Sequence, residues 1–400
     1  MRLVPRRVLA HDLSPGLTCR TYRLQRRQYA TSLSPPPPPL SGYTSLASRR
    51  LISVTGPDSA KFLQGIVTAN VTTRDGKPRS DGFYAAFLTA TGRVLYDVFI
   101  YPNHNTSGAS AEEPGYLIEV DADQASTLAK HIKRYKLRAK LAVRLLENDE
   151  ATVWHAWDDS TSANPSSIVK SGKFSLQDPR APGLGYRLLQ LDQHPPQIDL
   201  EPSTQEAYTI RRYLNGIPEG QDEISREHAL PQETNMDIMK GIDFHKGCYV
   251  GQELTIRTRH RGVVRKRILP CVVYEKEHAP PPTLQYHTDD TTSSLESVTA
   301  DMIPRDTSIG RFEKRGRSAG KWLKGVGNIG LGLCRLEIMT DVTLPGDAAS
   351  GAFNPEDEFV LDWGEEESRN TVKVKAFVPE WLREGLDAEN QRNEKLSSKK

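Results

Sequence analysis

The stretch that decides the fold is Gly241-Ile-Asp-Phe-His-Lys-Gly-Cys-Tyr-Val-Gly-Gln-Glu253, followed by Leu254-Thr-Ile-Arg-Thr-Arg259. Cys248 follows the basic residues His245 and Lys246, and nearby positive charge favours a thiolate over a thiol. Glycines lie on both sides of the cysteine, where they permit turns that other residues resist. Apolar and polar residues then alternate through 254–259, which predicts a strand. The pattern therefore predicts a reactive cysteine on a glycine-hinged loop that leads into a strand with a basic face.

A structural interpretation of Cys248 stays open, because free cysteine is commonly a small buried hydrophobe. The other cysteines are Cys19, Cys271 and Cys334, and no C-x-x-C pair is present, which argues against a zinc ribbon, a thioredoxin motif or a ferredoxin cluster motif. Cys271 and Cys334 lie within apolar strand patterns, so we expect both to pack in a core. One thiol cannot hold a cluster alone, but it can complete the coordination that a partner provides.

The charge of the chain is concentrated at its start. Residues 1–32 contain seven arginines and one acid, a net charge of +6, which leaves −4 for the rest of the 400 residues. An arginine-rich, acid-poor start with Arg26-Arg27-Gln28-Tyr29 before small residues is typical of a presequence for the mitochondrial matrix. The acidic remainder argues against a nucleic-acid partner. No apolar run approaches the roughly 18 residues of a membrane span, so we expect no membrane partner.

Periodicity and turn signals predict an α+β protein of several domains. Strands are expected at 51–54, 83–88, 93–101 and 115–120, and later at 268–274, 327–337 and 371–378. Helices are expected from Asp58, over 121–141, and after a capping box at Ser203–Glu206. The expected divisions are a presequence at 1–32, a Pro-rich linker at 33–42, an N-terminal α/β domain at 43–145, a middle α/β domain at 146–260, a C-terminal β-barrel at 261–382 with a disordered insert at about 275–306, and a disordered tail at 383–400.

The run Lys246-Gly-Cys-Tyr-Val-Gly-Gln-Glu253 strongly resembles the folate-binding YgfZ-type proteins, relatives of the glycine-cleavage aminomethyltransferase GcvT. Within that family the chain is most similar to the mitochondrial iron–sulfur cluster assembly factors of the Iba/Caf type. Further similar strings span most of the chain: Phe62-Leu-Gln-Gly65 with Thr68, Thr91–Asp97, Arg211-Arg212 with Gly216-Ile-Pro218, Leu230–Asn235, and Ile329–Glu337.

This resemblance implies two mixed α/β domains and a C-terminal antiparallel β-barrel around a central folate-sized hole. It also implies maturation of mitochondrial 4Fe-4S proteins, such as aconitase and lipoyl synthase, together with A-type (Isa) carrier proteins. The ligands it implies are tetrahydrofolate and an iron–sulfur cluster shared with a partner. The residues it assigns to catalysis or cluster contact are Lys246, Gly247, Cys248, Tyr249, Gly251, Gln252 and Glu253, with Cys248 as the transient metal ligand, and those it assigns to folate are Tyr84, Asp97, Arg211 and Arg212.

Two departures from the aminomethyltransferases bear on activity. Tyr96 stands where one of a pair of aspartates is usual, next to Asp97. Leu214 occupies the position of a pterin-binding glutamate, and an unpaired buried donor would cost about 1–3 kcal/mol. Three interpretations follow: an assembly factor that acts through Cys248, a folate-dependent one-carbon transferase that uses Asp97, and a docking module without chemistry. The departures favour the first, and thus a protein that is not itself an enzyme.

Overall fold

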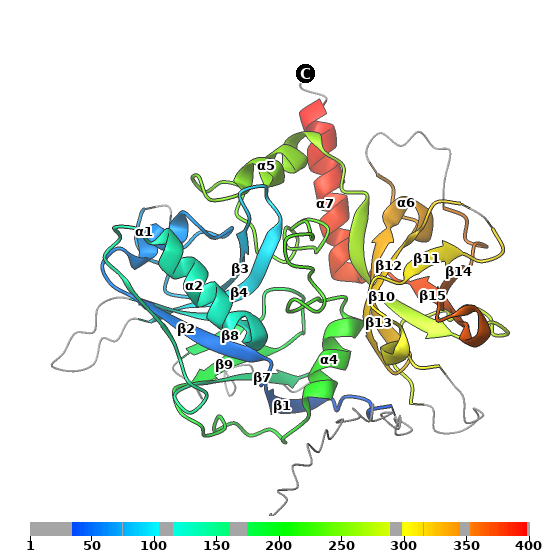
Figure 1. Cartoon of the computed structure of the whole chain (residues 1–400), viewed down its shortest axis with the longest axis horizontal. Helices are drawn as coiled ribbons and strands as arrows, with labels where there is room; N and C mark the ends of the chain where they lie inside the picture. Colours follow the sequence, from blue (N-terminus) through cyan, green and yellow to red (C-terminus); the bar gives the residue numbers. More distant parts are fainter. Residues whose placement is uncertain are drawn as a thin grey trace, which may run out of the picture. The chain divides into compact units, whose positions relative to one another are not determined.

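The computed structural model describes residues 34–73, 75–103, 115–160, 174–288, 298–314, 316–344 and 353–397. The expected presequence and the middle of the predicted insert lie outside these ranges. Two antiparallel sheets and a closed barrel account for the strands (Figure 1). The expected α+β class and the C-terminal barrel are therefore confirmed, whereas the domain boundaries stay predictions.

The first sheet has five strands in the order β3-β4-β5-β2-β6. Its members are β2 (Arg49–Thr55), β3 (Phe83–Leu88), β4 (Val94–Asn103), β5 (Gly115–Asp121) and β6 (Ala142–Leu145). Two helices pack on one face, α1 (Ser59–Gln64) and α2 (Ala125–Tyr135), with the short 3-10 helix η1 (Ala122–Gln124) before α2. Leu128 and Ile132 of α2 are fully buried against the sheet, because apolar residues at this spacing share one face of a helix.

The second sheet has the order β1-β7-β9-β8. Its strands are β1 (Ser41–Ser45), β7 (Thr152–Asp158), β8 (Phe174–Gln177) and β9 (Tyr186–Gln190). Helix α4 (Gln205–Leu214) follows, and Thr204 caps it by accepting a hydrogen bond from the Ala207 amide. The expected capping residue, Ser203, is thus one position too early. Strand β1, the first that the structure describes, pairs with β7, so residues before β2 complete the second sheet.

The barrel closes in the order β10-β13-β12-β11-β14-β15, with β15 paired again to β10. Its elements are β10 (Lys266–Tyr274), η2 (Ala300–Met302), β11 (Ser308–Arg311), β12 (Gly320–Val326), β13 (Ile329–Arg335), α6 (Leu336–Met339), β14 (Phe359–Trp363), η3 (Glu366–Ser368) and β15 (Asn370–Ala376). Cys271 and Cys334 are fully buried in its core, with sulfurs 3.9 Å apart, which agrees with their expected packing role.

Two segments differ from their predicted structure. Residues 254–259, expected as a strand, belong to helix α5 (Gln252–Arg261). The tail, expected to be disordered from 383, forms helix α7 (Glu380–Ser397), which lies beside α5 (Figure 1). Leu382 and Leu386, four residues apart, bury the inner face of α7 in the barrel cluster, and that contact orders an otherwise charged segment.

Candidate functional site

Cys248 lies on the loop that leads into α5, and it is the exposed cysteine among those the structure describes. His245 and Gly247 are also exposed, whereas Tyr249 is buried and anchors the loop from below. The Gln252 side chain closes the turn, since its Oε1 accepts the Tyr249 amide at 3.2 Å. Glu253 is exposed in the first turn of α5. The thiol is therefore open to a partner on a loop whose neighbours are fixed.

Hydrogen bonds fasten this loop to the segment after α1. The Thr68 hydroxyl donates to the Gly241 carbonyl at 2.6 Å, and the Asp243 amide donates to the Thr68 carbonyl at 3.0 Å. Beyond the cysteine, the Val250 amide donates to the Gly65 carbonyl at 3.1 Å. Thus both ends of the loop are tied to one segment, which limits how far Cys248 can move.

Lys246 takes part in this anchoring. Its Nζ donates to the carbonyls of Val67 at 2.6 Å and Ala69 at 2.8 Å, and lies 5.0 Å from the centre of the Tyr249 ring. Burial lowers the pKa of Lys246 to about 7. The amine thus points into the protein rather than serving as an exposed cation beside the thiol. The expected activation of Cys248 by Lys246 is not what this geometry supports.

Only one of the two flanking glycines is conformationally required. Gly251 has φ +81°, and a side chain there would overlap the Thr89 carbonyl and the Leu88 side chain. Gly247 has no positive φ and open space around it. Gly251 thus sets the sharp turn into α5 and brings the loop against the turn between β3 and β4.

Of the four residues expected to bind folate, Asp97, Arg211 and Arg212 are paired within the protein, whereas the buried Tyr84 hydroxyl has no hydrogen-bond partner among the described residues. Tyr84 is buried directly beneath Gly241, at the base of the Cys248 loop. Asp97 is buried, with Oδ2 3.3 Å from Arg49 and Oδ1 accepting the Gly220 amide at 3.1 Å. The carboxylate therefore stabilises a junction between β2, β4 and the loop after α4.

The two arginines are likewise paired. Arg211 donates to the Asp159 carboxylate at 3.0 Å and to the Gly183 carbonyl at 3.0 Å. Arg212 forms a bidentate pair with Glu223 at 2.8 and 3.0 Å. Burial lowers the pKa of its guanidinium, but the charges of Glu223 and Glu219 together with the hydrogen bonds to Glu223 raise it above its usual value. Both guanidinium groups are thus occupied by carboxylates, and the cavity that Arg212 lines with Arg49 and Gly220 includes neither Tyr84 nor Asp97.

Asp97 belongs to a larger buried ion network between the two sheets. Arg187 of β9 pairs with Glu119 of β5 and with Glu219, and Glu119 also accepts from Arg49 at 2.9 Å. The charges of neighbouring arginines hold the pKa of Glu219 well below its usual value against the opposing effect of burial. The network holds the two sheets together. It therefore stabilises the fold that carries the Cys248 loop without contacting that loop.

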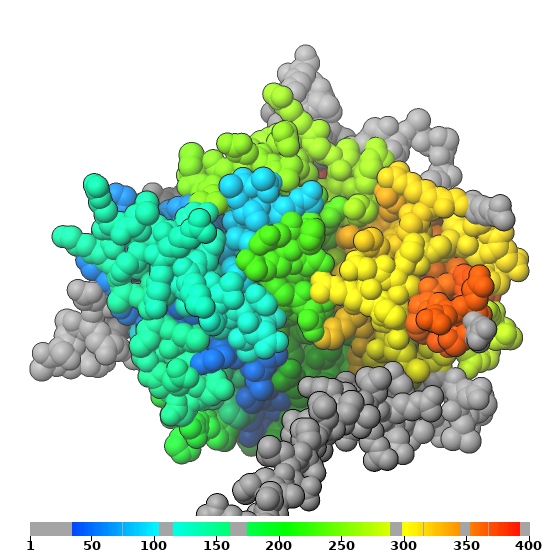
Figure 2. Space-filling view, in the orientation of Figure 1, coloured from blue at the N-terminus to red at the C-terminus, as the bar shows by residue number. Residues whose placement is uncertain are grey.

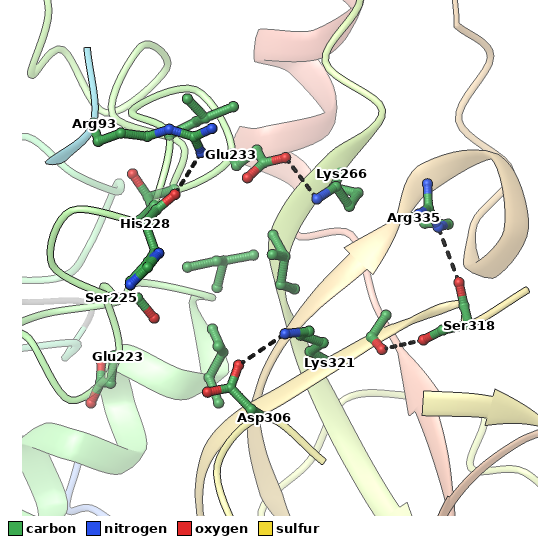
Figure 3. Close-up of a pocket in the computed structure, with 17 residues that line it drawn as sticks. Arg93, Glu223, Ser225, His228, Glu233, Lys266, Asp306, Ser318, Lys321 and Arg335 are labelled. Carbon is green, nitrogen blue, oxygen red and sulfur yellow. Dashed lines mark hydrogen bonds and ion pairs between the residues drawn. The ribbon is translucent and has the colours of Figure 1, made fainter. Parts of the chain in front are cut away.

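A cavity of about 440 Å³ opens between the loop 223–234 and the outer face of the barrel (Figure 3). Its floor includes Ile268, Leu323 and Leu333, and charged side chains surround it. Several of these are paired: Arg93 with the His228 carbonyl, Glu233 with Lys266, Asp306 with Lys321, and Arg335 with the Ser318 carbonyl. An apolar floor with a polar rim suits an amphipathic ligand. Tyr84, Asp97, Arg211 and Arg212 do not line this cavity.

Sequence reasoning missed the residues that hold the Cys248 loop. Gln64 donates to Asn70 at 2.6 Å, and Asn70 donates to the Asp243 carboxylate. The string Phe62-Leu-Gln-Gly65 with Thr68 was one signal for them. Its resemblance to the family's first helix gave no reason to connect it with a loop 180 residues away, so the contact could only be seen in the fold.

The fold is that of a known class of proteins. The crystal structure of glycine cleavage system aminomethyltransferase T from Bartonella henselae superposes with a TM-score of 0.54, covering 86% of each chain at 11% sequence identity. The family described as the CAF17 C-terminal beta-barrel domain matches residues 265–384. The aminomethyltransferase-like architecture expected from the resemblance is therefore confirmed, at a similarity that concerns the fold alone.

Sequence relatives define the family more closely. The mitochondrial iron-sulfur cluster assembly factor IBA57 homolog of Pyricularia oryzae is 58% identical over 87% of this chain and 87% of its own length. Homologs of the same name from Chaetomium globosum and Neurospora crassa are 51% and 47% identical, covering 86% and 95% of this chain and 84% and 90% of their own. The chain belongs to this family of mitochondrial IBA57 proteins. The expected family and mitochondrial location are thereby confirmed.

Proposed function

We propose that the protein is an iron–sulfur cluster assembly factor that acts through Cys248 in the mitochondrial matrix. The observation that carries this proposal is an exposed thiol on a loop tied at both ends. Membership of a family whose members are named as cluster assembly factors supports it. The cluster is cargo in this account: Cys248 provides one thiolate and a partner provides the remaining ligands, since a cluster needs about four.

The partner we propose is an A-type carrier, and the clients are apo-forms of 4Fe-4S proteins such as aconitase and lipoyl synthase. A thiolate on an ordered loop loses little conformational freedom when it joins a shared site. The clamp formed by Thr68, Lys246 and Asp243 thus prepares the thiol for capture of a cluster that a second protein presents.

A test in cells separates this function from folate chemistry. In a strain that lacks the protein, Cys248→Ala should fail to restore mitochondrial aconitase activity, whereas Cys271→Ala, a change in the barrel core, should restore it if the variant accumulates. Full restoration by Cys248→Ala at equal protein level would remove the thiol from the function. If Cys248→Ala and Asp97→Ala each restored aconitase activity fully, the docking-module interpretation would replace both the assembly role of Cys248 and the folate role of Asp97.

Tetrahydrofolate binding is a second candidate, supported by the amphipathic cavity beside the barrel. Leu323→Trp would fill its floor, and we expect this change to abolish any tetrahydrofolate binding measured by calorimetry. Aminomethyl transfer is not favoured, because Asp97 is held by Arg49 and Gly220 and Leu214 packs among apolar residues of α4 and the barrel. Absence of heat with the unmodified protein at millimolar tetrahydrofolate would dismiss the candidate.

A further inference from the structure

The outer face of α2 and the loop after it carry positive charge that the Cys248 site does not use. Residues 124–146 contain seven lysines and arginines and no acid. Five of these side chains are exposed and form no ion pair or hydrogen bond within the part of the chain that the structure describes; we call them the α2 cationic patch. Its members are Lys130, Lys133, Arg134, Arg138 and Lys140. The segment lies on the surface, on the side of the view opposite to the barrel (teal in Figure 2).

Helix stability explains only part of this charge. Cations in the last turn interact favourably with the helix dipole, which accounts for Lys133 and Arg134. Arg138 and Lys140 lie beyond the end of α2, where that benefit is absent. Asp58 accepts the backbone amide of Lys140 at 2.7 Å and leaves the ammonium group of this lysine unpaired. Residues 33–400 carry a net charge of −4. The patch is therefore a local concentration of positive charge on a part of the chain that is acidic as a whole.

An exposed apolar side chain lies within the patch. Leu137 is 86% exposed, and its φ of +44° places it in the left-handed region, where a leucine costs about 1–2 kcal/mol. Tyr135, two residues earlier, is 39% exposed. The inner face of α2 already buries Leu128 and Ile132, and the Tyr135 ring stacks on His131 with ring centres 4.5 Å apart, so Leu137 is the side chain that the fold does not need. A strained, solvent-facing leucine between cations indicates a surface that another molecule covers when the two are bound.

Cations around an exposed leucine and a tyrosine suit an anionic lipid surface. Each lysine or arginine near such a surface contributes about 1 kcal/mol of attraction, and the apolar and aromatic side chains enter the headgroup region. An acidic protein or a polyanion would use the charges but would gain less from Leu137. We propose that the α2 cationic patch, with Leu137 and Tyr135, docks this protein on an anionic phospholipid membrane. The proposed association is peripheral. It involves the membrane surface only, and it needs no membrane-spanning segment.

Co-sedimentation of the full chain with vesicles tests the proposal. The vesicles contain phosphatidylcholine alone or mixed with cardiolipin. The double variant Lys133→Glu/Arg138→Glu removes charge from the patch, and Arg257→Glu/Arg261→Glu is the matched control, because it makes the same charge change on exposed residues of α5. We expect binding only with cardiolipin, weakened at least about ten-fold in the patch variant and by less than about two-fold in the control. Equal losses in the two variants would overturn the proposal.

Two further measurements exclude other sources of binding. The arginines of residues 1–32 could also bind vesicles, but they are the same in all variants and cannot cause a difference between them. Hydrogen exchange locates the contact, and vesicles should slow the exchange of backbone amides in residues 130–142. Binding without protection there contradicts the proposal. Leu137→Asn keeps every charge and tolerates the left-handed conformation. It should weaken vesicle binding several-fold while leaving binding to soluble polyglutamate unchanged. Unaltered vesicle binding would show that Leu137 does not enter the headgroup region and would overturn the lipid assignment.

Discussion

Gly92 and Gly251 lie back to back, and their contact sets the position of the Cys248 loop. Both have left-handed backbones, with φ of +83° and +81°. A Cβ on Gly92 would lie 2.9 Å from the Gly251 carbonyl oxygen, and one on Gly251 would lie 3.3 Å from the Gly92 Cα. The turn between β3 and β4 thus supports the turn into α5, so two segments far apart in the sequence hold the thiol in place.

Gly251→Ala should destabilise the fold by at least about 2 kcal/mol, because alanine resists the left-handed region and would overlap the Thr89 carbonyl. Gly247→Ala is the matched control, since open space surrounds that residue, and we expect a change within about 0.5 kcal/mol. Urea unfolding of both variants measures the difference. Similar stabilities for the two would contradict the assignment of Gly251 as the hinge.

Lys246 should give stability a distinctive pH dependence. Burial lowers its pKa from 10.5 to about 7, so between these values the unfolded chain binds more protons than the folded one. The free energy of unfolding contributed by this group therefore rises as pH increases from about 7 toward 10.5. Lys246→Met removes the titration, and the difference between the two proteins should change by a few kcal/mol across that window. Parallel stability curves in urea would show that the amine titrates normally.

The buried ion network should be sensitive to loss of a single charge. Arg187→Met removes one cation from a buried network in which Glu119 keeps only Arg49 and Glu219 keeps only Arg180 as ion-pair partners, and we expect a loss of about 3–5 kcal/mol in the free energy of unfolding. Arg144→Met, which breaks the exposed pair with Glu150, should cost less than about 1 kcal/mol. Thermal and urea unfolding compare the two. Comparable losses would mean that the network does not hold the sheets together.

Thiol accessibility should separate the three cysteines that the structure describes. Iodoacetamide should alkylate Cys248 in the native protein while Cys271 and Cys334 react only after unfolding, because both are fully buried. The neighbouring Cys271 thiol and burial also raise the pKa of Cys334, which slows its reaction further. Peptide mass spectrometry at short reaction times provides the measurement. Equal labelling of all three would mean that the barrel core is open.

Short-range patterns predicted β2 to β5 of the first sheet and β10, β13 and β15 of the barrel, because their apolar runs are bounded by clear turns. They did not predict β6, β11, β12 or β14. The pattern at Leu254–Arg259 misled, since alternation over six residues also occurs in a helix when tertiary contacts select it. Here Leu254 packs on Gly92, the Gln232 side chain donates to the Thr255 carbonyl, and Arg259 pairs with Glu389 of α7. None of these partners is near in sequence, so local periodicity could not identify the helix.

The candidate site was predictable in part. The motif around Cys248 pointed to an exposed thiol, and the structure places it at the surface. The anchoring role of Lys246 was not predictable, because the sequence around a lysine near a cysteine does not show the direction in which its amine points. The same holds for Arg211 and Arg212, whose carboxylate partners Asp159 and Glu223 were not recognisable before the fold brought them together.

The most direct test of the central claim is an anaerobic titration of the protein with an A-type carrier loaded with a 2Fe-2S cluster, followed by the visible spectrum of the cluster. The comparison is between the unmodified protein and Cys248→Ser, which preserves the shape of the exposed loop. We expect a changed spectrum and a stable complex that requires Cys248. The same spectrum and the same complex with Cys248→Ser would contradict the proposal that this thiol takes part in handling the cluster.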